Sequence, residues 1–321
     1  MKPHRFAIRA LAALAVCWSL AAPAESTAPP VPGREGLNAV LWMQTAHEYA
    51  LLAAQTYAAA ARALPDAKAL PVALADPDIP PPAQDTPPAI VLDLDETVLE
   101  TSRYGAGLLV AGRQHREVDW AAWVDRGEGG LVPGALDFLR AARDQGYRIF
   151  YVTNRTCPDG GRGEAYPHPA CPQREATVAL ARRLDLPFAD DPKSFLLRND
   201  QTGWESGDKS PRRRFLSRSW KVVMLVGDDL GDFLPRDRVQ ALRAQRPAGQ
   251  TVGESAPLPI AAWRERFGTQ WFLLPNPAYG SWETSLAPCA VPDRESADCT
   301  RQRLEGKYRV LVPATPPPPA P

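Results

Sequence analysis

Residues 89–97 read A-I-V-L-D-L-D-E-T and decide the fold. The apolar run follows two prolines and predicts a short buried strand, which ends at Asp93 and Asp95, with Thr97 two residues further on. Carboxylates are costly to bury, and the ligands of open α/β sheets bind beyond the carboxyl ends of the strands. The stretch therefore predicts a reaction site at this strand end. An acidic strand end that leads into an ordinary turn is the alternative.

Helical and strand patterns alternate along the rest of the chain. This rhythm favours an α/β fold in which a mostly parallel sheet is covered by helices on both faces. We predict helices from Pro133 to Gly146, over 172–184 and near 236–246, and further strands at 149–152, 194–198, 222–226 and 271–274.

Three segments outside this rhythm need separate interpretations. Residues 37–64 contain no proline or glycine and place Trp42, Ala46, Tyr49, Ala53 and Tyr57 on one helical face, which predicts one long helix packed on the main domain. An aromatic stripe of this kind indicates core packing, and a cofactor-binding face is the alternative. Eight prolines in 65–88 predict an extended strap. Weak periodicity and several glycines in 98–130 predict an irregular insertion.

The composition fits an exported globular protein. The chain has 321 residues, 45% of them hydrophobic, and a formal net charge of zero, so we expect one sizeable core and no nucleic-acid polymer as partner. Residues 1–24 resemble a signal peptide, because three basic residues precede an apolar run that ends in A-P-A. The run is too short to span a membrane. Its removal takes away three basic and no acidic residues, which leaves a formal charge of −3.

The five cysteines have two interpretations. Cys17 lies in L-A-V-C, which faintly resembles a lipoprotein processing site; valine fits that site poorly, so membrane association is expected only if Cys17 is lipidated. The pairs Cys157 with Cys171 and Cys289 with Cys299 predict two disulfides that close short loops. A zinc site is the alternative, although no C-x-x-C occurs and no histidine has ligand spacing to these cysteines.

Polar signatures follow or link most of the predicted strands. Each alone reads as a helix cap, a solvated charge or an acidic turn. Together, a hydroxyl, a lysine and two carboxylate clusters at one sheet edge suit phosphoryl transfer, which needs a nucleophile, a divalent metal and positive charge around the equatorial oxygens. The signatures are D-L-D-E-T, T-N-R at 153–155, Lys209 in G-D-K-S-P, and G-D-D-L-G-D at 227–232.

These segments resemble the signature motifs of the haloacid dehalogenase-like phosphohydrolases, and more specifically those of the bacterial class C acid phosphatases. The resemblance covers about residues 37–285 and includes L-N-A-V-L-W, D-L-D-E-T, V-T-N-R, D-K-S, G-D-D-L-G-D-F and, at 275–283, P-N-P-A-Y-G-S-W-E. It implies a Rossmannoid three-layer sandwich with a small cap, a homodimer, and a periplasmic or secreted enzyme. An outer-membrane lipoprotein is the alternative location.

The resemblance also implies a mechanism. Asp93 would attack phosphorus and form an aspartyl-phosphate. Asp95 would protonate the leaving group and then deprotonate the hydrolytic water, which fits an acidic optimum. Magnesium, Mg²⁺, would be held by the Asp93 carboxylate, the Asp95 backbone carbonyl and Asp228, an all-oxygen set that suits a hard cation.

Further residues receive roles from the same resemblance. Thr153 and Lys209 would bind the phosphoryl oxygens, and Asp232 would orient Lys209 or a metal-bound water. Asp229 would support the loop. The substrate would also meet Thr97 and Asn154.

The leaving group in this family is commonly a nucleoside. Trp120 and Tyr279 match the positions whose rings hold the base, and stacking on flat rings tolerates any base. Packing of the insertion against the core is the alternative for both rings, and Trp123 is the expected packing residue. His115 and His168 receive no role, because Asp95 already supplies the acid and base.

These expectations define the domain organisation. Residues 25–88 form a helix and strap, 89–285 the phosphatase core, and 286–321 a C-terminal extension with a proline-rich tail. The loop 156–172 departs from the family pattern and is expected near the mouth of the site. The expected function is an exported acid phosphatase acting on phosphomonoesters, including nucleoside 5'-monophosphates and nicotinamide mononucleotide. A phosphotransferase to alcohols and a non-catalytic storage or binding protein are the alternatives.

Overall fold

Five parallel strands form the central sheet of the computed structural model. The structure describes residues 35–74, 79, 82–83, 85–157, 171–245, 251, 259–286, 289 and 296–312, all within the unit Pro32–Pro321. The order across the sheet is β5-β4-β1-β6-β7, and each neighbouring pair is parallel. The predicted α/β fold is confirmed. The strands are β1 (Pro88–Leu92), β4 (Arg148–Thr156), β5 (Phe195–Arg198), β6 (Lys221–Gly227) and β7 (Trp271–Leu273).

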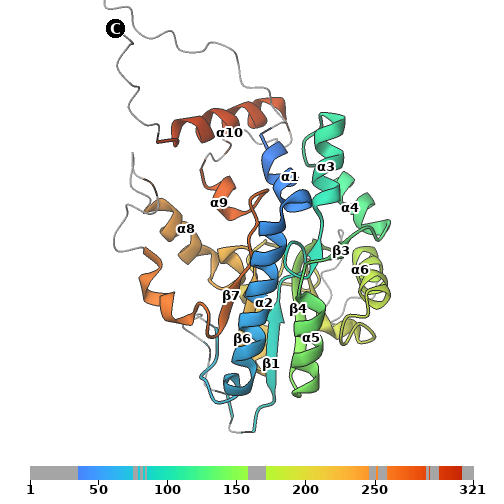
Figure 1. Ribbon diagram of the computed structural model, residues 1–321, viewed down its shortest axis with the longest axis vertical. Coiled ribbons are helices and arrows are strands. Elements are labelled where there is room, and N and C mark those ends of the chain that lie inside the picture. The colour runs from blue at the N-terminus through green and yellow to red at the C-terminus, as the bar shows by residue number, and fades with distance from the viewer. Residues whose placement is uncertain are drawn as a thin grey trace, which may run out of the picture. The chain divides into compact units, whose positions relative to one another are not determined.

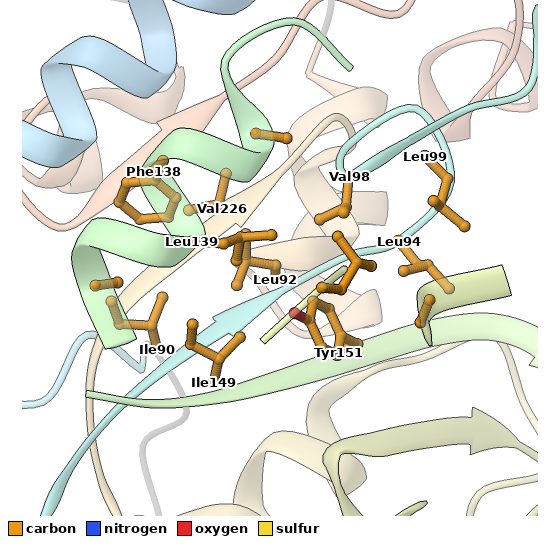
Figure 2. Close-up of a cluster of buried hydrophobic side chains, with 14 of the residues drawn as sticks. Ile90, Leu92, Leu94, Val98, Leu99, Phe138, Leu139, Ile149, Tyr151 and Val226 are labelled. Carbon is orange, nitrogen blue, oxygen red and sulfur yellow. The ribbon is translucent and has the colours of Figure 1, made fainter. Parts of the chain in front are cut away.

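Helices cover both faces of this sheet (Figure 1). Alternate residues of β1 belong to different cores: Ile90 and Leu92 pack on one face, and Ala89 and Val91 on the other. Figure 2 shows the first core, in which Phe138 and Leu139 of α5 lie over the side chains of β1 and β4. The first face carries α2 (His47–Ala67), α5 (Ala135–Asp144) and α6 (Pro172–Arg183); the second carries α7 (Ser210–Ser217) and α8 (Arg236–Ala244).

The single helix predicted over 37–64 is in fact two helices. Helix α1 (Leu37–Thr45) ends where Ala46 adopts an extended conformation, with ψ of 126°, and α2 begins at the next residue. The two helices pack on different elements, since α1 lies against the insertion helix α3 whereas α2 covers α5. Tyr49, Ala53 and Tyr57 are buried, so the aromatic stripe is core packing as expected.

The insertion at 98–130 is largely helical, so the prediction of an irregular segment was wrong. It contains β2 (Leu99–Glu100), which pairs with β3 (Gly130–Leu131) in an antiparallel ladder, and the helices α3 (Ser102–Ala111) and α4 (Glu117–Asp125). Glycine obscured α3 in the sequence. A methyl group on Gly105 would lie 3.2 Å from Cγ2 of Val40, so glycine permits α1 and α3 to approach closely. This insertion, residues 98–130, is called the cap below.

The remaining elements complete the chain. Helix α2 continues to Ala67, so the first residues of the predicted strap are helical; further on, the Ala73 amide donates to the Val222 carbonyl (2.8 Å). A C-terminal helix, α10 (Ala297–Arg309), was not predicted, and neither was α7. The signal peptide, residues 158–170 of the long loop with His168, and the proline-rich tail lie outside the described residues. The short elements are η1 (Pro192–Ser194), η2 (Leu230–Asp232), η4 (Pro259–Arg266) and α9 (Ser281–Thr284).

Both predicted disulfides are present, between Cys157 and Cys171 and between Cys289 and Cys299. The first joins the end of β4 to the start of α6, and the second ties α10 to the segment that follows α9. Within the described part of the chain, no helix is both long enough and apolar enough to cross a membrane.

Candidate active site

The strand order brings the predicted signatures to one edge of the sheet. Strand β1 lies between β4 and β6, so the residues that follow these three strands are neighbours. The Asp93 amide donates to the Val226 carbonyl at 3.0 Å, which places the end of β1 beside the end of β6. From β1 the chain continues to β4 and β5 on one side, whereas β6 and β7 lie on the other side. The strand order thus reverses between β1 and β6, and α/β proteins bind ligands at such a switch point.

Lys209 lies at the centre of the site and is buried. It is the residue that precedes α7, and its ammonium forms ion pairs with Asp93 and, at 2.6 Å, with Oδ1 of Asp232. Burial alone would lower the pKa of this ammonium, but the Asp232 and Asp93 carboxylates outweigh burial and raise it. Lys209 therefore carries a fixed positive charge at the end of β1.

Asp228 and Asp232 are held by an extensive set of hydrogen bonds. Thr97 Oγ1 donates to Oδ1 of Asp228 and Asn276 Nδ2 donates to its Oδ2, both at 2.8 Å. The amides of Asp228 and Asp229 donate to Oδ2 of Asp232 at 3.1 and 3.0 Å. Both carboxylates are thus oriented by the protein itself.

The acidic groups of this edge repel one another in a poorly solvated position. Burial, followed by the charge of Asp232, raises the pKa of Asp228 to about 7. Burial also raises the pKa of Asp93, the Asp232 and Asp228 carboxylates raise it further, and the Lys209 ammonium opposes them. One valine from each of the three central strands lines the same small hollow as Asp93, Lys209 and Asp232, which explains the weak solvation.

This set of groups fits a divalent cation. Asp93, Asp228 and Asp232 each offer a carboxylate oxygen within 4.8 Å of the others. Three buried or half-buried carboxylates face one ammonium, so a hard divalent cation would balance the excess negative charge. Asp93 and Asp228 were the predicted side-chain ligands. Asp232 joins them in space, although the Lys209 ammonium and two backbone amides already bind its oxygens.

The Asp95 carboxylate lies outside this acidic cluster and binds Arg155 instead. Arg155 Nη2 donates to Oδ1 at 2.7 Å, and Nε approaches Oδ1 and Oδ2 at 3.2 and 3.1 Å. The Arg155 side chain is fully buried. Arg155 belongs to the motif V-T-N-R, but no role was predicted for it. A basic residue at the end of a buried strand, beside an acidic motif, indicates a partner carboxylate.

The carboxyl-terminal residues of β4 are held by further contacts. Thr153 is buried, and its Oγ1 accepts from the Arg155 amide (3.1 Å). Arg212, also buried, donates to the Thr153 carbonyl and to Oδ1 of Asn154 (2.7 Å). Asn154 Nδ2 donates to the Gly207 carbonyl at 3.2 Å. Arg212 was missed because three consecutive arginines at 212–214 look like a solvated run.

The family model for the acid phosphatases of subfamily IIIB in the haloacid dehalogenase (HAD) superfamily matches residues 9–282. The chain belongs to this acid phosphatase family. The resemblance inferred from the motifs is thereby confirmed, and so is the expectation of a phosphomonoester hydrolase.

Solved structures agree with this assignment of the acid phosphatase. It is similar to the class C acid phosphatase from Bacillus anthracis, with 26% identity, a TM-score of 0.64, and coverage of 88% of this chain and 99% of that chain. A second structure of that enzyme, with tungstate bound, gives a TM-score of 0.65 at the same identity and coverage.

The aromatic residues of the phosphatase cap form one cluster. Trp120 stacks on Trp123 with 5.1 Å between ring centroids and 18° between planes, and Tyr104 packs edge-on against Trp120 at 4.9 Å. Trp123 is buried, as expected of a packing residue. One face of Trp120 is therefore covered by a neighbour. His115 Nδ1 lies 3.1 Å from the Tyr104 hydroxyl, at the outer side of this cluster.

Tyr279 lies on the loop between β7 and α9. The residue is 43% exposed, yet burial of its hydroxyl raises the pKa, with the Glu96, Asp228 and Asp95 carboxylates adding to the effect and a hydrogen bond with Thr101 opposing it. The phenol thus points toward the acidic edge while part of the ring remains open to solvent.

Thr97 and Asp229, which also had expected roles at the site, form hydrogen bonds within the protein. Thr97 is fully buried, its hydroxyl donates to Asp228, and its carbonyl accepts from the Tyr57 hydroxyl (2.6 Å). Asp229 accepts from the Gly231 amide (2.8 Å) and the Ser281 amide (2.5 Å), so it joins the loop after β6 to α9. Asp229 has the loop-supporting contacts expected of it, whereas Thr97 lies beneath the site, turned toward Asp228.

The pKa values predict how pH acts on the metal-free acid phosphatase. The pKa of buried Glu96 is raised to about 8, chiefly by burial, and that of Asp228 to about 7. The folded state therefore binds more protons than the unfolded state, and stability that is present below the unfolded pKa values is lost as the pH rises through 7 and 8. Each pKa unit corresponds to about 1.4 kcal/mol, so we expect the thermal unfolding midpoint in chelator to fall clearly between acidic and mildly alkaline pH.

The matched measurement uses Asp228→Asn, which should flatten this dependence because it removes one of the carboxyl groups whose pKa is raised. A midpoint that rises with pH in the unsubstituted protein would contradict the assignment.

Proposed function

We propose that this acid phosphatase hydrolyses phosphomonoesters through an aspartyl-phosphate on Asp93 and depends on Mg²⁺. The observation that carries the proposal is the buried ion pair between Asp93 and Lys209 at the carboxyl end of the central strand, beside Asp228. A carboxylate nucleophile needs nearby positive charge to accept an anionic substrate, and the ammonium supplies it.

Each chemical step has a residue to perform it. An Asp93 carboxylate oxygen forms a bond to phosphorus while the bond from phosphorus to the leaving oxygen breaks and a proton moves from the Asp95 carboxyl to that oxygen. Water then attacks the aspartyl-phosphate, Asp95 takes its proton, and the Asp93 oxygen leaves. Lys209 and Thr153 bind the phosphoryl oxygens, and Asp232 orients Lys209 through the 2.6 Å hydrogen bond.

The cation would be held by the carboxylates of Asp93 and Asp228, with the Asp95 backbone carbonyl as the third protein ligand. When bound, it would supply positive charge to the phosphoryl oxygens. Tungstate in the similar Bacillus anthracis enzyme supports a site that accepts a tetrahedral oxyanion.

For Thr97 and Asn154, which were expected to contact the substrate, we propose supporting roles. We now assign Thr97 to the orientation of Asp228, since its hydroxyl donates to that carboxylate in a fully buried position. Asn154 is exposed and braced by Arg212 and the Gly207 carbonyl, so it shapes the rim of the phosphoryl site.

For the substrate we propose nucleoside 5'-monophosphates, including nicotinamide mononucleotide. A base would stack on the exposed part of the Tyr279 ring and against Trp120, which is only partly covered by its neighbours in the cap. Export fits the two disulfides, which persist in an oxidising compartment.

The deciding experiment is a panel of phosphomonoesters assayed with and without Mg²⁺. We expect phosphate release from p-nitrophenyl phosphate at about pH 5–6, abolished by chelation, and faster release from nucleotides than from small alkyl phosphates. Addition of glycerol separates hydrolysis from transfer, because a phosphotransferase would yield glycerol phosphate. Binding of nucleotides without turnover would instead indicate a storage or binding protein.

Trp120→Ala tests the substrate class. Loss of a stacking face should raise KM for nucleotides about 10-fold, in line with about 1–3 kcal/mol for base stacking, and leave KM for small alkyl phosphates nearly unchanged. Trp123→Phe is the comparison variant, since it alters the buried half of the pair. An equal rise in KM for both substrate types would remove the stacking role.

A further inference from the structure

We propose that Arg155 is a positioning residue for the reaction: it holds the Asp95 carboxyl in the orientation that delivers a proton to the leaving oxygen. The proposal rests on the proposed function, in which Asp95 is the acid and base. The observation behind it is that Arg155 binds Asp95 with two nitrogens. The other carboxylates of the edge have different partners: Asp93 and Asp232 pair with Lys209, and Asp228 accepts from Thr97 and Asn276.

The contact has the geometry of a directional restraint. Nη2 donates to Oδ1 at 2.7 Å, and the Nε–H is shared between Oδ1 at 3.2 Å and Oδ2 at 3.1 Å. A planar guanidinium fixes both the position and the plane of a carboxylate, whereas a lysine ammonium fixes only a point charge. Oδ2 accepts only from the shared Nε–H of the guanidinium, so its contact with Arg155 is the weaker one. It is therefore the oxygen less engaged by Arg155 and more available to a reacting group.

Arg155 is itself fixed on three sides. Its Nη1 donates to Thr177 Oγ1 in α6 at 3.0 Å, its backbone amide donates to Thr153 Oγ1 at 3.1 Å, and its guanidinium lies 5.8 Å from the ring centroid of Trp120 in the cap. Thr177 in turn donates to the Gln173 carbonyl at 2.6 Å. The guanidinium is fully buried, so few side-chain conformations are open to it.

The chemical consequence depends on the leaving group. When the bond from phosphorus to an alkyl oxygen breaks, the alkoxide needs a proton from Asp95, so an error in the position of that proton slows the step. Nitrophenolate is stable as an anion and leaves without a proton. Loss of the Arg155 restraint should therefore slow the first phosphoryl transfer selectively for alkyl and nucleoside phosphates. Hydrolysis of the aspartyl-phosphate, in which Asp95 takes a proton, is common to all substrates.

The test compares Arg155→Lys with the unsubstituted enzyme on p-nitrophenyl phosphate and on an alkyl phosphate, with Mg²⁺ present. We expect kcat/KM, which reports the first phosphoryl transfer, to fall about 100-fold for the alkyl ester and no more than about threefold for the nitrophenyl ester. Arg148→Lys is the matched control, because Arg148 lies at the other end of β4 and pairs with Asp191 and Ser194, with only 14% of its side chain exposed. It should leave both rates unchanged.

Asp95→Asn separates failure of this proposal from failure of the proposed function. If Asp95→Asn shows no dependence on the leaving group, the assignment of Asp95 as acid is wrong and the positioning role falls with it. If Asp95→Asn shows the dependence but Arg155→Lys slows both esters equally, or neither, Arg155 does not act through Asp95. Combining the two substitutions should slow the alkyl ester no further than Asp95→Asn alone.

Thr177→Val provides a second variant, and it carries the test if Arg155→Lys fails to fold. It removes the acceptor of Nη1 without touching Asp95. We expect a smaller loss, about 10-fold, again confined to the alkyl ester. Thermal unfolding of each variant verifies the fold, and a loss by Thr177→Val that is equal for both esters would overturn the proposal.

Discussion

Asp93→Asn is expected to lower kcat/KM for every phosphomonoester by at least about 10⁴-fold, because it removes the oxygen nucleophile that forms the covalent intermediate. The amide has nearly the same shape as the carboxylate and can still accept from Lys209, so the architecture of the site should persist. Burial and neighbouring carboxylates raise the pKa of Asp93, which means that its negative charge is unfavourable in the metal-free fold. A neutral residue here should therefore not lower the thermal unfolding midpoint of metal-free protein.

The measurement is steady-state phosphate release together with the mass of enzyme quenched during turnover. Unsubstituted enzyme should show a phosphoryl adduct and Asp93→Asn should show none. Asp200→Asn is the control, since Asp200 is buried and is also ion-paired, with Arg174. Activity of Asp93→Asn within about tenfold of the unsubstituted enzyme would rule out the covalent mechanism.

Gly227→Ala should be the most damaging substitution outside the residues that meet substrate. A methyl group on Gly227 would overlap Oδ2, Cγ and Cβ of Asp232. Asp232 cannot move aside cheaply, because its carboxylate accepts from Lys209 and from the amides of Asp228 and Asp229. Displacing it disturbs the ammonium and the acidic cluster together.

We expect kcat/KM to fall about 100-fold, the usual effect of a displacement near 1 Å in an active site, and the free energy of unfolding to fall by about 1–3 kcal/mol from overpacking. Kinetics and chemical denaturation measure the two effects. Gly107→Ala in α3 is the control, since a methyl group there meets no atom within 4 Å. Normal kinetics in Gly227→Ala would show that Asp232 does not set the position of Lys209.

The sheet and much of the site could be predicted because they rest on short-range patterns. Apolar runs that end in polar signatures identified the strands, and parallel strands bring their carboxyl ends to one edge. The meeting of Asp93, Lys209 and Asp228 followed from that topology. The disulfides followed from the proximity of each pair in the sequence.

What could not be predicted depends on contacts between distant segments. The break at Ala46 reflects the different partners of α1 and α2, and a local helical pattern carries no record of them. The cap helices are weakly amphipathic. Helix α3 also contains glycines, of which Gly105 lies where α3 meets α1. The choice of partner for Asp95 depends on which donor reaches it in space, and Arg155 reaches it from another strand.

The hydrogen bond from Asn276 to Asp228 also bears on when the active site is completed during synthesis of the chain. Asp93 is synthesised early and Asn276 late, because Asn276 follows β7, the edge strand of the sheet. Contacts so distant along the chain form only after large entropic costs of loop closure have been met. A growing chain therefore holds the reactive aspartate without the completed site around it, and its chemistry begins only when almost the whole sequence has folded.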